Sequence, residues 1–154
     1  MNATEADKEL EHQIREIATR ALWDTVMQDI ENNKFDKLLS LIKEIRDDII
    51  SFIPSRKDLH TEIEEKVDIV FIKQQLEHNT LSQDDFLNLF LYLAHWIRKL
   101  QAPADDEWFD AFVKDVVEES KQKEFIKILP LSIGGLNEST TRIKGHFHNL
   151  TQDS

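Results

Sequence analysis

The sequence predicts an all-α protein, a bundle of five to six helices. Three observations support this class. The 154 residues contain three glycines, and all of them follow residue 133. Apolar residues recur at helical spacing through most of the chain. The prolines Pro54, Pro103 and Pro130 lie between these periodic segments, where a helix is expected to stop.

A first helix is predicted over residues 4–32, with Thr4 as its N-cap. Its apolar residues change phase half-way along, so the two halves present nearly opposite faces. We therefore expect the halves to contact different surfaces, and a bend near residues 18–19 is the alternative. The two apolar sets are Leu10, Ile14 and Ile17 in the first half and Trp23, Val26 and Ile30 in the second.

A second helix is predicted after Asn33 and before Pro54, with a broad apolar face and a charged back. The next stretch predicts the central helix of the bundle, about residues 58–78, because apolar residues occur on two of its sides. Gln74 falls within one of these apolar faces, where it would need hydrogen-bond partners. Asn79 suits the left-handed C-terminal cap.

A further helix is expected over residues 82–100, where Ser82 and Asp85 have capping-box spacing. Another follows Pro103, from Asp105 to about Ser120, and a short apolar segment over 125–131 can form a sixth. Residues 132–154 are rich in Gly, Ser, Thr and Asn, so we expect a flexible polar tail. The predicted organisation is one helical domain, 1–131, followed by this tail.

Composition excludes several classes of function. The net charge of −11 argues against binding to nucleic acid, because nucleic acid phosphates require a basic surface. There is no cysteine, and hence no disulfide, thiolate nucleophile or cysteine metal site. No apolar run approaches the length that spans a bilayer, and no secretory signal opens the chain. We expect a cytoplasmic protein with no nucleic acid partner and no membrane insertion.

Candidate chemistry is sparse. His146 and His148 are the nearest approach to a metal pair, but no third ligand is in view. The other histidines lack metal-binding spacing, and the late glycines do not form a phosphate-binding loop. We therefore predict no catalytic residues, no metal and no cofactor, and a binding module in preference to an enzyme. An enzyme with an unrecognised carboxylate or histidine site is the alternative.

Several motifs resemble the N-terminal part of the T-complex protein 11 family, over about residues 15–107. These are Ala21-Leu22-Trp23-Asp24, the runs Leu38–Arg56 and Glu62–Gln75, and Leu100-Gln101-Ala102-Pro103 followed by Asp106. Asp105 departs from the pattern, because the family has arginine there, and Asn79 stands where it often has glycine.

The resemblance implies an all-helical, non-enzymatic domain associated with cyclic-AMP/protein kinase A signalling. Its matching polar positions here are Arg56, Asp68, Lys73 and Gln74. An internal network of caps and salt bridges is the first interpretation of these four residues, and a partner surface is the second.

Self-association is also predicted, because more apolar faces occur than a bundle of this size covers and because the family's domain is longer than this chain. We expect a homodimer, with Leu10, Ile14 and Ile17 as the contact. The competing idea is that the segment from Phe125 folds back and covers the gap. The predicted function is a protein–protein interaction domain with a partner of unknown identity, and a homo-oligomeric structural protein is a further alternative.

Overall fold

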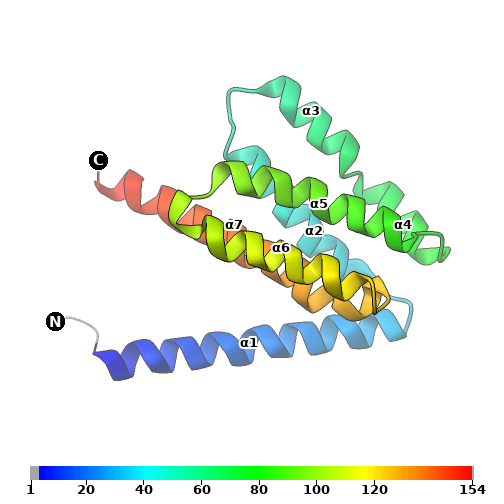
Figure 1. Ribbon diagram of the computed structural model, residues 1–154, viewed down its shortest axis with the longest axis horizontal. Helices are drawn as coiled ribbons and strands as arrows, with labels where there is room; N and C mark the ends of the chain where they lie inside the picture. The colour runs from blue at the N-terminus through cyan, green and yellow to red at the C-terminus, as the bar shows by residue number, and fades with distance from the viewer. Residues whose placement is uncertain (1–3, 154) are drawn as a thin grey trace. The chain divides into compact units, whose positions relative to one another are not determined.

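The computed structural model describes the backbone of residues 4–153 and the side chains up to residue 147 (Figure 1). The all-α prediction is confirmed, since this range holds seven α-helices, two short 3-10 helices and no strand. In order they are α1 Glu5–Glu31, α2 Asp36–Ser51, α3 Lys57–Lys66, α4 Ile69–Glu77, α5 Gln83–Leu100, η1 Pro103–Asp105, α6 Asp106–Ser120, η2 Phe125–Ile128 and α7 Leu129–Asp153.

The chain divides into two compact units, Met1–Leu38 and Leu39–Ser154. The first unit contains α1, which begins with the predicted cap. The Thr4 hydroxyl accepts the Asp7 amide at 3.1 Å, and the Asp7 carboxylate accepts the Thr4 amide in return. The helix is continuous, so its apolar phase shift is not a break. Trp23 and Val26 in its second half are buried, whereas every described side chain before Trp23 is exposed.

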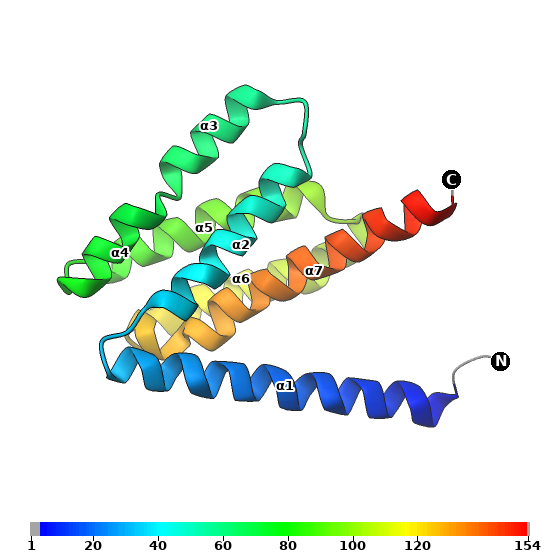
Figure 2. The ribbon, with the colours of Figure 1, turned by 180° about the vertical axis from the view of Figure 1, so that it is seen from behind.

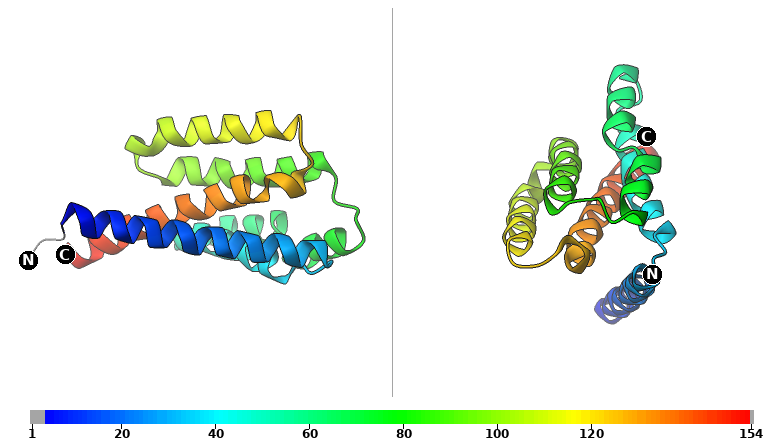
Figure 3. Two further views of the ribbon diagram at one scale, coloured as in Figure 1. Left: turned by 90° about the horizontal axis from the view of Figure 1, so that it is seen from below. Right: turned by 90° about the vertical axis from the view of Figure 1, so that its right-hand side faces the viewer.

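The second unit is built around α7. Figure 3 shows α7 between α2 on one side and the antiparallel pair α5–α6 on the other. Stacked Phe52 and Phe147 rings, 5.3 Å apart, join α7 to the end of α2. Lys144 of α7 adds an ion pair to Asp48 of α2 at 3.2 Å. The fully enclosed side chains of this core include Ile45, Ile49, Phe90, Leu93, Ile97, Val116, Ile133 and Leu136.

The predicted helix over 58–78 is two helices. The chain leaves helical geometry at Val67 and Asp68, and the Asp68 carboxylate caps α4 by accepting the Phe71 amide at 3.1 Å. The two apolar faces in this stretch therefore belong to two short helices of different phase. Neither helix is central, since α3 fully buries Ile63 and α4 buries Ile72 and Leu76.

The prediction of a flexible tail over 132–154 is wrong. The segment is helical as far as Asp153 and forms most of α7. Its buried hydroxyls are satisfied by backbone carbonyls four residues earlier in the chain: Ser132 donates to the Ile128 carbonyl of η2 at 2.8 Å, and Ser139 donates to the Gly135 carbonyl at 3.0 Å. Such side chains can enter a core because their donors are not left unpaired.

Glycine serves packing in α7. A Cβ atom at Gly135 would overlap the Phe112 ring of α6, so the two helices approach as closely as they do only because this position lacks a side chain. No helix in the described part of the chain combines the length and apolar character needed to cross a membrane.

Candidate functional site

The outer face of α4 is the most exposed apolar surface of the second unit. Val70 and Phe71 are 69% and 55% exposed. Gln74 lies one turn further on, in the i+4 position from Val70 and the i+3 position from Phe71, and is also exposed. Lys73 borders this face and forms an ion pair with Glu77 at 3.8 Å. We call Val70, Phe71, Lys73 and Gln74 the α4 patch.

The predicted polar residues make local contacts. Arg56 forks onto Asp58, with Nε–Oδ1 and Nη2–Oδ2 distances of 3.1 and 2.9 Å. This hydrogen bond lowers the pKa of Asp58 to about 2, with a smaller Coulombic contribution from Arg56. Asp68 is the α4 cap. Arg56 therefore pairs with Asp58 and not with Asp68. The side chains of Arg56 and Asp68 are both exposed.

The prediction that Gln74 lies in a buried face is wrong. Its side chain is exposed, and its backbone carbonyl is 2.8 Å from Nδ1 of His78. The reason is the break at Asp68, after which α4 has its own orientation. The buried side of α4 is the one that contains Ile72 and Leu76. Gln74 is thereby placed beside Phe71 on the open side of the helix.

The predicted dimer residues are accessible. Leu10, Ile14 and Ile17 are 56%, 57% and 66% exposed on α1. Their spacing places them on one stripe of that helix. Self-association through this stripe stays a prediction.

Sequence reasoning missed a polar cluster where α5 meets α6. Arg98 of α5 reaches Asp110 through Nε at 2.8 Å and Asp106 through Nη1 at 2.8 Å. The Arg98 hydrogen bond, followed by its charge, lowers the pKa of Asp110 below its usual value, although burial opposes the shift. Gln101 donates to Asp106 at 2.8 Å. These residues lie too far apart in sequence for spacing alone to pair them.

A second arginine joins α7 to the start of α6. The Arg142 guanidinium lies over the Trp108 ring, 4.9 Å from its centroid, and 3.4 Å from Asp105. The Asp105 carboxylate, at a position where the family resemblance implies an arginine, here faces an arginine supplied by α7. Trp108 in turn stacks on Phe112 with a centroid distance of 5.7 Å. This cluster therefore stabilises the packing of α6 against α7.

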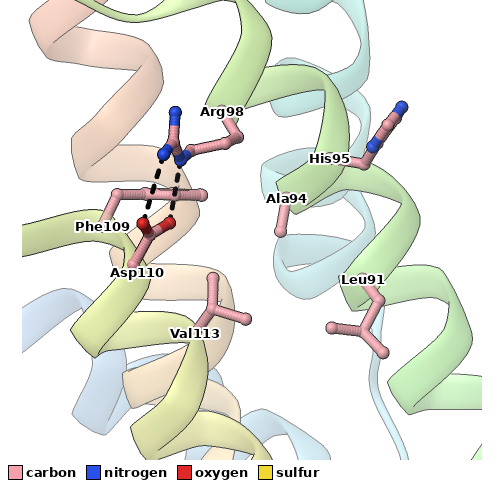
Figure 4. A pocket seen from close by; sticks show the side chains of 7 residues that line it. All are labelled: Leu91, Ala94, His95, Arg98, Phe109, Asp110 and Val113. Atoms are coloured by element: carbon pink, nitrogen blue, oxygen red, sulfur yellow. Dashed lines mark hydrogen bonds and ion pairs between the residues drawn. The ribbon is translucent and has the colours of Figure 1, made fainter. Parts of the chain in front are cut away.

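A shallow depression of about 250 Å³ lies between α5 and α6 (Figure 4). Leu91, Ala94 and Val113 point into it, and the Arg98–Asp110 pair closes one end. Ligand pockets usually have volumes of about 300–1,000 Å³ and bring several polar groups together. Here the two charged groups are directed at each other, so the depression offers a small apolar surface and no evident chemistry.

No group of three His, Asp or Glu side chains that could hold a metal ion occurs among the described residues. The side chain of His148 lies outside the described residues, so the predicted pair with His146 is not placed. Two of the other histidines, His60 and His78, contact backbone carbonyls, whereas His12 lies 3.2 Å from the Glu16 carboxylate and His95 contacts the Trp96 ring. His60 Nε2, for example, lies 2.6 Å from the Ile53 carbonyl oxygen.

Comparison with known proteins decides the relationship suggested by the motifs. The family model described as T-complex protein 11 matches residues 2–136. The chain belongs to the T-complex protein 11 family. A human protein described as T-complex protein 11 homolog is 33% identical over 101 residues, which is 64% of this chain and 20% of the relative. This chain thus spans about a fifth of the length of that relative. No solved structure matches this chain significantly.

The T-complex protein 11 match extends beyond the motifs at both ends. It takes in the first part of α1 and continues through η2 to Leu136 in α7. The α4 patch, the Arg98 cluster and the contact between Gly135 and Phe112 all lie inside it. The family region therefore includes the packing of α7 against α6 and not only the helices that carry the quoted motifs.

Proposed function

We propose that this chain is a non-enzymatic interaction domain that binds a protein partner through the α4 patch. The observation that carries the proposal is the exposure of Val70 and Phe71 at 69% and 55%. Both lie within the run Glu62–Gln75, which carries part of the family resemblance. Exposed apolar side chains bordered by polar ones are typical of protein interaction sites.

The chemistry of the patch favours a protein partner over a small molecule. A convex helix face offers no enclosure, whereas aromatic and aliphatic side chains can enter a pocket on another protein. Gln74 and Lys73 would supply polar contacts at the edge. The resemblance to the family supports the further proposal that the partner belongs to a cytoplasmic signalling assembly of the cyclic-AMP/protein kinase A type.

The test compares the chain with the double variant Val70→Ser/Phe71→Ser. Purified regulatory and catalytic subunits of protein kinase A are titrated against each by calorimetry, and cytosolic partners are recovered by affinity purification. We expect binding to be lost by the patch variant. Leu131→Ser is the matched control, since Leu131 is 39% exposed and belongs to a different helix, α7.

The outcomes separate the alternatives. Partner recovery unchanged in the patch variant would rule out α4 as the surface. Turnover of a metabolite by the purified chain in a broad substrate screen would contradict the non-enzymatic role. Circular dichroism of each variant verifies that the loss of two exposed side chains has left the helices intact.

A further inference from the structure

Helix α3 is attached to the second unit mainly at its two ends. A turn containing Pro54 joins it to α2, and the non-helical pair Val67–Asp68 joins it to α4 (Figures 1 and 2). Val67 has φ −115° and ψ 68°, and Asp68 has φ −84° and ψ 104°. Short non-helical segments of this kind are where rigid elements rotate relative to one another.

Little apolar surface fastens the body of the helix. Within α3 only Ile63 is buried, Leu59 and His60 are half-buried, and the other side chains are exposed. The hydrogen bonds from neighbouring helices lie at the joints. His60 contacts the Ile53 carbonyl at 2.6 Å, and Arg46 of α2 donates to the Val67 carbonyl at 3.1 Å. Segments with few buried contacts are those that open before the rest of a protein unfolds.

We propose that α3 is a lid, which swings out on its two joints while the remainder of the unit stays folded. Opening exposes Ile63, which is fully buried in the closed state. It also changes the surface next to the α4 patch, because the Val67–Asp68 joint immediately precedes α4. The proposal does not depend on the identity or existence of a partner at that patch.

The absence of cysteine from the chain makes a direct test possible. A single thiol is introduced as Ile63→Cys in α3 or as Ile133→Cys in α7. Both isoleucines are fully buried, so both thiols are protected in the closed state. The rate of labelling by a soluble disulfide reagent is measured without denaturant and at low denaturant concentrations, and the global stability of each variant is measured separately.

A lid predicts labelling at position 63 at least about 100-fold faster than at position 133 after correction for global stability, with little dependence on denaturant. Equal corrected rates, both rising steeply with denaturant, would overturn the proposal. Hydrogen exchange of the unmodified chain measures the opening of α3 without any substitution. The Val67 amide, which bonds to the Ile63 carbonyl at 2.8 Å, should exchange by local opening and well before amides in α7.

Discussion

Gly135 and Gly145 lie in the same helix in opposite surroundings. At Gly135 a Cβ would overlap the Phe112 ring, and that ring is itself held between Trp108 and Phe90, each 5.7 Å away. At Gly145 no atom lies within 4 Å of a Cβ position. The two glycines therefore separate the effect of packing from the effect of helix propensity.

We predict that Gly135→Ala lowers the free energy of unfolding by about 1–3 kcal/mol, because overpacking exceeds the gain in helix propensity. Gly145→Ala should raise the free energy by up to about 1 kcal/mol, since only propensity changes there. Urea denaturation measures both. A stabilised Gly135→Ala would mean that α6 and α7 are further apart than described.

The fork between Arg56 and Asp58 gives a prediction for pH. The pKa of Asp58 is lowered from 3.8 to about 2, so its carboxylate stays ionised in the folded chain at a pH where it would be protonated in the unfolded chain. The stabilisation is present above pH 4 and is lost as the pH falls from 4 toward 2. Titration followed by NMR of the Asp58 side-chain carbon should give a midpoint near 2. In Arg56→Ala the midpoint should return toward 3.8, and an unchanged midpoint would show that Arg56 is not the cause.

At the scale of the elements, one side chain fixes the turn between α6 and α7. Gln83, at the start of α5, donates from Nε2 to the Ser120 and Lys123 carbonyls at 2.9 and 2.8 Å. Its Oε1 accepts the Phe125 amide at 2.7 Å. The adjacent rings of Phe86 and Phe125 stack with centroids 4.9 Å apart. Three otherwise unpaired backbone groups of the turn are thus satisfied by a single amide.

We predict that Gln83→Ala destabilises the protein by about 1–3 kcal/mol, because these backbone groups lose their partners. Gln83→Glu should be at least as harmful, since it removes both donors and places a carboxylate against two carbonyl oxygens. Gln122→Ala, a change at an exposed position in the same turn, should stay within about 0.5 kcal/mol of the parent. Thermal unfolding compares the three, and an equal effect of Gln83→Ala and Gln122→Ala would exclude the structural role of Gln83.

At the scale of the whole molecule, the stripe of Leu10, Ile14 and Ile17 predicts that two copies associate through α1. We expect light scattering after size exclusion to give twice 18.1 kDa at tens of micromolar. Ile14→Glu should return the mass to 18.1 kDa, because it places a charge in the middle of the stripe. Leu22→Glu is the matched control, since Leu22 is exposed on α1 but off the stripe. A single 18.1 kDa species for the parent chain would contradict the homodimer.

The parts of the fold that sequence reasoning recovered are those governed by local chemistry. The predicted N-cap at Thr4 and the predicted capping box at Ser82 both form, and Asn79 adopts the expected left-handed conformation with φ 53°. Helical periodicity likewise located α1, α2, α5 and α6. These signals depend on residues a few positions apart, so a single sequence contains them in full.

The parts that failed depend on distant residues. The apolar residues change phase both in α1 and near Asp68. In α1 the helix continues through the change, whereas at Asp68 the helix breaks, and only the packing around each segment determines which of the two occurs. The glycines of α7 led to the prediction of a tail. The packing role of Gly135 was not visible in the sequence, because Phe112, which it contacts, lies on another helix. The Arg98 and Arg142 clusters also join separate helices. Helical periodicity within one segment does not predict contacts between residues of different helices.

The composition of α7 has a consequence for how the chain folds. A segment so rich in glycine, serine, threonine and asparagine has little helicity when detached from its neighbours, because these residues favour other conformations. Its helical structure must therefore form together with its docking between α2 and the α5–α6 pair. The far-UV circular dichroism contributed by this segment then reports tertiary assembly, and a nascent chain that ends before Leu129 would present the facing sides of its other helices to chaperones.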